Sequence, residues 1–70
     1  MTTTVDARGL SCPQPALLTR NAVRAAGSEA VEVLVDTATA RDNCTRVAQR
    51  EGWKVEVSEE GGGYRLLLQR

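Results

Sequence analysis

The 70-residue sequence predicts an α/β (α+β) two-layer sandwich, in which a four-stranded mixed sheet carries two helices on one face. Segments with strand-like and helix-like periodicity follow one another in the order β-α-β-α-β-β. Residues 30–36 and 53–58 alternate apolar and polar side chains, as strands do when only one face is covered. A run of glycines before the last segment indicates a hairpin. We therefore expect residues 1–70 to form a single domain.

The first half of the chain supplies a strand, a helix and a second strand. Residues 3–7 are β-like, and residues 12–26 carry apolar side chains at helical spacings of three and four. The apolar face of this helix is expected to comprise Pro15, Leu18, Ala22 and Ala25. Gly27 ends the helix, as glycine at a C-cap does. In the strand at residues 30–36, the side chains of Val31, Val33 and Val35 face one way.

The second half begins with a helix at residues 39–51. Its covered face is expected to comprise Ala40, Cys44, Val47, Ala48 and Glu51. Thr39 and Asp42 have the spacing of a capping box, so Thr39 is expected to cap this helix. The strand at residues 53–58 follows, with its inward-facing side expected to comprise Trp53, Val55 and Val57.

The connections between segments set the direction of each strand. Helical crossovers make the first three strands parallel, and a turn at residues 59–63 makes the last strand, 64–70, antiparallel. Both helices then begin at the carboxyl ends of strands, where α/β folds commonly bind ligands. This rim is expected to hold Arg8, Cys12, Arg41 and Asp42, the last two in the first turn of the second helix.

Cys12-Pro13-Gln14-Pro15 is the most informative stretch of the chain. Proline suits the first turn of a helix, where the N–H that it lacks would have had no partner. The two prolines therefore predict the first turn, with Cys12 as its cap. The positive end of the helix dipole favours the thiolate, which is the reactive form of cysteine.

The donors expected to support this thiolate are few. A capping side chain normally accepts from the second or third helical N–H, and Pro15 has none. The Gln14 N–H is therefore the main local donor, with Arg8 or Arg41 as a charged neighbour. The alternative is that Cys12 packs under a loop as an inert side chain.

The chemistry open to Cys12 is narrow because the chain contains no histidine and no Cys-x-x-Cys pair. Cysteine hydrolases need a base to move protons, and a thioredoxin-like cycle needs a second, nearby cysteine. A lone thiolate can accept a group, hold it and pass it on. A sulfane sulfur suits this role, since persulfide exchange is thiolate attack on sulfur.

Other candidate residues have structural interpretations. Cys44 lies on the apolar face of its helix and is interpreted as a core residue rather than a functional one. Arg41 and Asp42 fit either a solvated helix start or contact residues of the rim. Trp53 is expected in the core. Four further arginines are interpreted as solvated helix faces or docking surface: Arg20, Arg24, Arg46 and Arg50.

Composition narrows the class of protein. Nine basic and nine acidic side chains give a formal charge of zero, which argues against direct nucleic-acid binding through phosphates. No apolar run approaches the length of a membrane span, and residues 1–5 lack the features of a signal peptide. A cytoplasmic location with reduced thiols is therefore expected. Two cysteines without histidine disfavour a metal site, and no cofactor is expected.

Residues 6–15, Asp-Ala-Arg-Gly-Leu-Ser-Cys-Pro-Gln-Pro, closely resemble the signature of the TusA/SirA-like sulfur-carrier family. Val35-Asp36 followed by Arg41-Asp42, and the Gly52-Trp53 junction, match the family more loosely. The resemblance covers essentially the whole chain. It implies a two-layer sandwich like the C-terminal domain of bacterial translation initiation factor three.

The resemblance also implies a function. Cys12 would carry a persulfide, loaded by a cysteine desulfurase or a rhodanese-like donor and passed to a reactive cysteine of an acceptor protein. Arg41 and Asp42 would contact partners. The residues that would shape the site are Arg8, Gly9, Pro13, Gln14 and Pro15. Family members serve tRNA thiolation, molybdenum-cofactor assembly or sulfur oxidation, and some are linked to selenium metabolism.

The stretch Asn43-Cys44-Thr45-Arg46-Val47-Ala48 is closer to the YedF-like branch of the family than to its tRNA-thiolation branch. Cys44 lies outside the signature and receives no role. Two other hypotheses stay open: a non-catalytic regulatory or RNA/protein-binding module, and a redox switch through oxidation of Cys12. The sequence names neither donor nor acceptor, and it does not separate an enzyme from a stoichiometric carrier.

Overall fold

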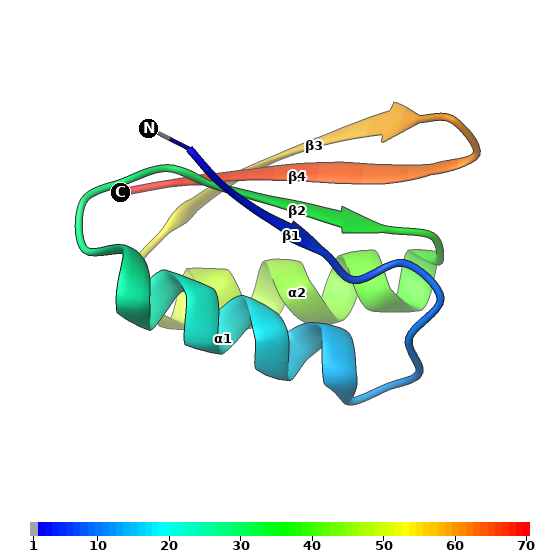
Figure 1. The fold of residues 1–70 in the computed structure, drawn as a ribbon, viewed down its shortest axis with the longest axis horizontal. Helices are drawn as coiled ribbons and strands as arrows, with labels where there is room; N and C mark the ends of the chain where they lie inside the picture. Colours follow the sequence, from blue (N-terminus) through cyan, green and yellow to red (C-terminus); the bar gives the residue numbers. More distant parts are fainter. Residues whose placement is uncertain (1) are drawn as a thin grey trace.

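The computed structural model describes residues 2–70; Met1, part of the N-terminal segment considered above, lies outside the described residues. The elements in chain order are β1 (Thr3–Asp6), α1 (Gln14–Ala26), β2 (Val31–Val35), α2 (Ala38–Arg50), β3 (Lys54–Glu60) and β4 (Gly63–Gln69). Their order and the four-stranded mixed sheet confirm the predicted fold class. Both helices lie in one layer against the same face of the sheet (Figure 1).

The strands are arranged in the order β1-β2-β4-β3. β1 and β2 pair in parallel, whereas β4 is antiparallel to both of its neighbours. β3 therefore runs in the same direction as β1 and β2, as predicted. It does not lie beside them, because β4 is inserted between β2 and β3. Periodicity predicts the direction of each strand but not this insertion.

The core lies between the sheet and the helix layer. Val31 and Val33 of β2 are fully buried and pair across the sheet with Leu68 and Leu66 of β4. Each such side chain stabilises the fold by roughly 1.5–3 kcal/mol. α1 packs against β1 and β2, and α2 packs against β3 and β4. Trp53, immediately before β3, is only 3% exposed, which confirms its predicted place in the core.

The buried face of α1 differs from the predicted one. Its buried residues are Pro15, Thr19 and Val23, whereas Leu18 is 38% exposed and Ala25 is exposed as well. Thr19 tolerates burial because its hydroxyl donates a hydrogen bond to the Pro15 carbonyl at 2.9 Å. Leucine thus lies on the surface of this helix where apolar spacing predicted it inside.

Thr37, and not Thr39, caps α2. Its backbone is extended, and its hydroxyl accepts a hydrogen bond from the Ala40 N–H at 3.1 Å. An N-cap reaches the third helical N–H in this way. Thr39 is already the second residue of the helix, and Asp42 lies beyond its first turn. The predicted capping box is therefore wrong, because the Thr37 hydroxyl already accepts from the third helical N–H.

The hairpin between β3 and β4 is tighter than predicted. Glu60 pairs with Gly63, so the turn consists of Gly61 and Gly62 rather than residues 59–63. The φ values of these two glycines, 57° and 84°, are those of a two-residue hairpin turn. Gly63 belongs to β4, where an added Cβ would lie 2.5 Å from the Val35 carbonyl oxygen. Glycine at this position therefore lets β4 approach the end of β2.

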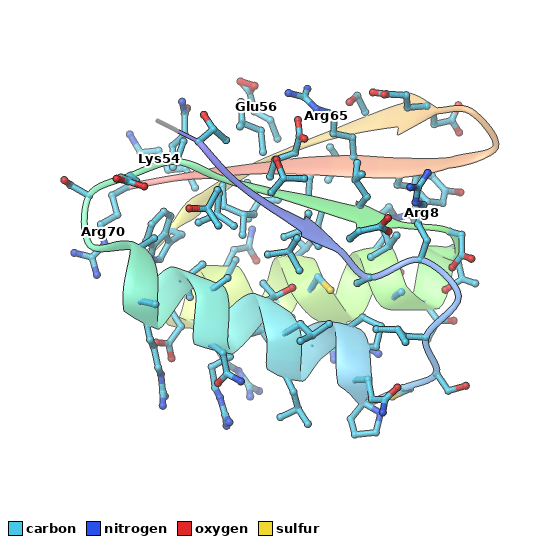
Figure 2. The ribbon with its side chains drawn as sticks, in the orientation of Figure 1. Arg8, Lys54, Glu56, Arg65 and Arg70 are labelled. Carbon is cyan, nitrogen blue, oxygen red and sulfur yellow. The ribbon has the colours of Figure 1, made fainter. Side chains whose placement is uncertain are left out.

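The other face of the sheet is mostly polar, as the alternation predicts, although Leu34 and Leu67 also lie on it. Figure 2 shows Glu56 and Arg65 pointing away from the helices. Arg65 forms an ion pair with Glu32, and the Thr4 hydroxyl donates to the same carboxylate at 3.4 Å. Val57 pairs with the buried Leu66, so it lies on the side facing the helices as predicted, but it is 46% exposed there.

Candidate functional site

The loop between β1 and α1 lies at the end of the sheet where both helices begin (Figure 1). It carries Cys12, a free and exposed thiol. Asn43 of α2 reaches the same place, although it is 31 residues away in sequence. The topology thus brings the start of α1 and the start of α2 together, as the predicted strand directions require.

Two carboxylates hold this loop in place. Asp6 accepts from Nε and Nη2 of Arg8 at 2.9 and 2.8 Å, and from the Arg8 backbone N–H at 3.1 Å. These bonds lower the pKa of Asp6 to about 2. Asp36, just after β2, accepts from the Gly9 N–H at 2.9 Å. Gly9 has a φ of 78°, which glycine adopts without the steric cost of a Cβ.

The start of α1 differs from the predicted one. Pro13 is the N-cap residue and Pro15 lies inside the first turn, so Cys12 does not cap the helix. The Cys12–Pro13 peptide bond is cis. The Gln14 N–H, the donor predicted for the thiolate, instead donates to the Ser11 carbonyl at 2.9 Å. That bond closes the turn before the helix and leaves the Gln14 N–H unavailable to the sulfur.

A cavity of about 310 Å³ opens beside Cys12. Its wall on the α2 side is formed by Thr37, Thr39, Ala40 and Asn43. Its other wall includes Leu10, Ser11, Pro13 and Pro15. Among the described residues, none that lines this cavity carries a charged side chain. The cavity therefore offers the thiol a mixture of apolar surface, hydroxyls and one amide.

Asn43 is the side chain that contacts the thiol. Its Nδ2 lies 3.7 Å from the Cys12 Sγ, and the residue is half-buried. Sequence reasoning missed this residue. The available signal was its spacing of four from Thr39, which places both side chains on the same side of a helix.

The charged neighbours predicted for Cys12 are engaged elsewhere. Arg41 donates from Nε to Asp42 at 3.0 Å, and its guanidinium lies 4.7 Å from the centre of the Tyr64 ring. Arg8 is paired with Asp6 and lines a separate cavity of about 200 Å³ beside the hairpin turn. The hydrogen bonds with carboxylates raise the pKa of both arginines.

The structure thus separates the predicted site residues into three groups. Cys12, Pro13 and Pro15 line the cavity. Gly9 and Gln14 shape its loop through backbone hydrogen bonds. Arg8, Arg41 and Asp42 lie outside the cavity wall, and the role of Arg41 and Asp42 as partner contacts stays a prediction.

The second cysteine has a different environment. Cys44 is fully buried on α2 among core residues, which confirms its interpretation as part of the core. Burial raises the pKa of its thiol, while the Thr19 hydroxyl beside it acts in the opposite direction. Within residues 2–70, no cluster of three or more His, Cys, Asp and Glu residues could hold a metal ion.

An apolar surface adjoins the thiol-bearing loop. Leu10, Leu17 and Leu18 are 38–42% exposed, and with Gln14 they line a shallow groove of about 250 Å³. Leu10 lines both this groove and the Cys12 cavity, so the two are adjacent. No helix among the described residues has the length and apolar character needed to cross a membrane.

Comparison with known proteins decides the family. Residues 3–70 match the family model described as "Sulfurtransferase TusA". The chain belongs to the TusA family. No curated protein matches it. The crystal structure of a SirA-like protein from Desulfitobacterium hafniense is similar, with a TM-score of 0.84 and 28% sequence identity over 99% of this chain and 96% of that chain.

TusA-family membership supports a sulfur-carrier role for the chain. It also implies interaction with sulfur donor and acceptor proteins in general. The exposed thiol of Cys12, the uncharged cavity and the apolar groove are the features of the described residues that bear on such a role.

Proposed function

We propose that the protein carries sulfane sulfur as a persulfide on Cys12, which it receives from a donor enzyme and passes to a cysteine of an acceptor protein. The observation that carries this proposal is an exposed free thiol, at the rim where both helices begin, in a chain of the sulfurtransferase family. Cys44 is buried and therefore takes no part.

Each transfer is an exchange between sulfur atoms. The Cys12 thiolate attacks the outer sulfur of a persulfide on the donor, a new S–S bond forms, and the donor cysteine leaves as a thiolate. In the second transfer the acceptor thiolate attacks the outer sulfur on Cys12, and the Cys12 thiolate leaves. Neither transfer consumes an oxidant or a reductant. Neither requires a histidine, and the sequence contains none.

The surface around Cys12 suits contact with another protein. Large apolar side chains are costly to expose, and Leu10, Leu17 and Leu18 are all more than a third exposed next to the thiol-bearing loop. A partner that covered this groove would bring its own cysteine to the mouth of the Cys12 cavity. Arg41 and Asp42 lie on the neighbouring α2 and form part of the proposed contact surface.

The finer assignments follow from the motifs. Residues 43–48 favour the YedF-like branch, so selenium or sulfur pathways other than tRNA thiolation are proposed as the destination. A cysteine desulfurase or a rhodanese-like protein is the proposed donor. A cytoplasmic location belongs to the same proposal, because a carrier thiol must stay reduced between transfers.

Intact-protein mass spectrometry tests the proposal. The reduced protein is incubated with a cysteine desulfurase and cysteine, and separately with a rhodanese and thiosulfate. We expect a mass gain of one sulfur atom that a reductant removes. Cys12→Ser should show no gain, whereas the matched variant Cys44→Ser should load like the wild type.

Two outcomes would overturn the carrier function. The first is sulfur loading that persists in Cys12→Ser. The second is no gain with either donor on a thiol shown to be reduced, which would favour the non-catalytic binding module. A gain with only one donor would identify the class of the donor enzyme.

A further inference from the structure

We propose that Asn43 is a sulfur-binding residue, whose side-chain amide donates a hydrogen bond to Cys12 Sγ and stabilises negative charge there. This inference deepens the proposed function and rests on it for the persulfide steps. It applies to the free thiolate as well, and that part can be tested without any sulfur donor.

The contact joins two elements that are far apart in sequence. The Nδ2 of Asn43 lies 3.7 Å from Sγ, within the range of a hydrogen bond to sulfur, and the two residues are 31 positions apart. Asn43 is half-buried on α2, and the position of that helix start is set by the Thr37 cap. The donor therefore belongs to a regular element, while the acceptor lies on a loop.

The donors that the sequence predicts for the thiolate have other partners. The Gln14 N–H is bonded to Ser11, and the guanidinium groups of Arg8 and Arg41 are bonded to carboxylates. Asp36 accepts from the backbone, and three further arginines of the two helices lie outside the cavity wall: Arg20 of α1, and Arg46 and Arg50 of α2. None of them lines the cavity, in which Cys12 is the one ionisable residue described.

A neutral amide suits a carrier better than a base would. The amide does not accept the proton of the thiol. It therefore acts only as a hydrogen-bond donor to the thiolate. Hydrogen bonds to an anionic acceptor are stronger than those between neutral groups, so the amide favours the thiolate over the thiol. It adds no fixed positive charge that would hold the sulfur in an ion pair after transfer.

The same contact acts on the delivery step. When an acceptor thiolate attacks the outer sulfur, the bond between that sulfur and Cys12 Sγ breaks, and the electron pair stays on Sγ. A thiolate whose negative charge is stabilised is a better leaving group, so the bond breaks faster. Asn43 already lies at hydrogen-bonding distance from this atom, so it stabilises the charge where it develops.

Two variants and a matched control test this role. Asn43→Leu removes the donor at similar size, and Asn43→Asp keeps the shape but places an anionic oxygen beside the sulfur. Gln49→Leu is the control, because it removes an exposed amide from the same helix outside the cavity. Circular dichroism establishes that each variant is folded; if Asn43→Leu is not, Asn43→Ala carries the test, because the charge of Asn43→Asp acts on the thiolate by itself.

The first readout is the pH profile of iodoacetamide alkylation at Cys12, resolved by peptide mass spectrometry. Loss of the hydrogen bond should slow alkylation near neutral pH by about three- to tenfold in Asn43→Leu, and further in Asn43→Asp. The profiles should shift to higher pH and converge with the wild type where the thiol is fully ionised. A merely structural change in access would instead alter the rate by the same factor at every pH.

The second readout is sulfur release from persulfidated protein to glutathione. Release should be about three- to tenfold slower in Asn43→Leu than in the wild type, and unchanged in Gln49→Leu. If Asn43→Leu and Asn43→Asp both match the wild type, or differ by a constant factor at all pH values, the role of Asn43 is overturned and the carrier function stands. If the wild type takes no sulfur, the carrier function fails, and the alkylation profiles alone decide the role of Asn43 at the thiolate.

Discussion

The two cysteines show how position decides the reactivity of one residue type. Cys12 is exposed on a loop that Asp6 and Asp36 hold through hydrogen bonds. Cys44 is fully buried, and burial raises the pKa of its thiol. The thiolate is the nucleophilic form of cysteine. Cys44 is poorly placed to react, because reagents cannot reach it and its raised pKa disfavours the thiolate. The chain therefore presents a single exposed thiol to its surroundings.

Alkylation of the native protein at neutral pH should distinguish these residues. We expect iodoacetamide to modify Cys12 at least about 100-fold faster than Cys44, because the core around Cys44 must open before the reagent can enter. Peptide mass spectrometry after a time course gives both rates. In concentrated urea the two rates should become similar, and comparable labelling of both residues in the native protein would contradict the prediction.

At the scale of elements, α2 connects the core to the site. Its Ala40, Cys44 and Ala48 are buried, as helical spacing predicts, and Asn43 next to them reaches the thiol. The helix start is fixed by the hydrogen bond between the Ala40 N–H and the Thr37 hydroxyl. A weakened cap would loosen the helix start, from which Thr37 and Thr39 line the cavity.

Thr37→Ala should therefore destabilise the protein by about 1 kcal/mol, the typical cost of removing an N-cap hydroxyl. Urea unfolding followed by circular dichroism measures the change in the free energy of unfolding. Thr39→Ala is the matched control, since Thr39 is exposed within the first turn and makes no cap; it should change stability by less than about 0.5 kcal/mol. The reverse ranking would mean that Thr39 caps the helix after all.

The identity of each element was predictable because each one buries a single face. The alternation of Val31, Val33 and Val35 matches their burial, and the run of glycines marks the hairpin. The face of α1 was not predictable from apolarity, because Thr19 becomes an acceptable core residue only through its bond to Pro15. The position of β4 between β2 and β3 depends on pairing between distant segments, which local periodicity does not encode.

The site was predictable only in part, because one of its contacts joins residues far apart in sequence. Local sequence indicates a helix start and a reactive thiol at Cys12, and topology brings α2 close to it. Carboxylates close in sequence compete with the thiolate for the arginines expected near it. Arg8 and Arg41 are bonded to Asp6 and Asp42, which lie close to them in sequence. Asn43 contacts the sulfur through tertiary packing alone.

At the scale of the whole molecule, the formal net charge is zero, and some of the charged side chains form specific ion pairs. Arg24 of α1 bonds Glu51 at the end of α2 at 3.0 Å, and Arg8 bonds Asp6 beside the site. Hydrogen bonds from Arg8 lower the pKa of Asp6 from its ordinary value of 3.8 to about 2, and those from Arg24 lower the pKa of Glu51. Both arginines and Asp6 are more than half exposed, so the contribution of each pair to stability is modest.

These shifts determine how stability depends on pH. Below the ordinary pKa of each carboxyl, the unfolded chain binds more protons than the folded chain, so acid favours unfolding. The contribution of Asp6 is therefore fully present above about pH 4 and is lost as the pH falls toward about 2. The sequence contains no histidine, the side chain that ordinarily titrates between about pH 5 and 8.

The melting temperature should accordingly be flat between about pH 5 and 8 and should fall below about pH 4. Thermal denaturation followed by circular dichroism across this range gives the curve. Asp6→Asn removes one of the titrating groups and should flatten the acid decline while lowering the plateau slightly, because Asn forms a weaker contact with Arg8. A step in the wild-type curve between about pH 5 and 8 would contradict this account, because the folded chain would then titrate a group other than these carboxylates.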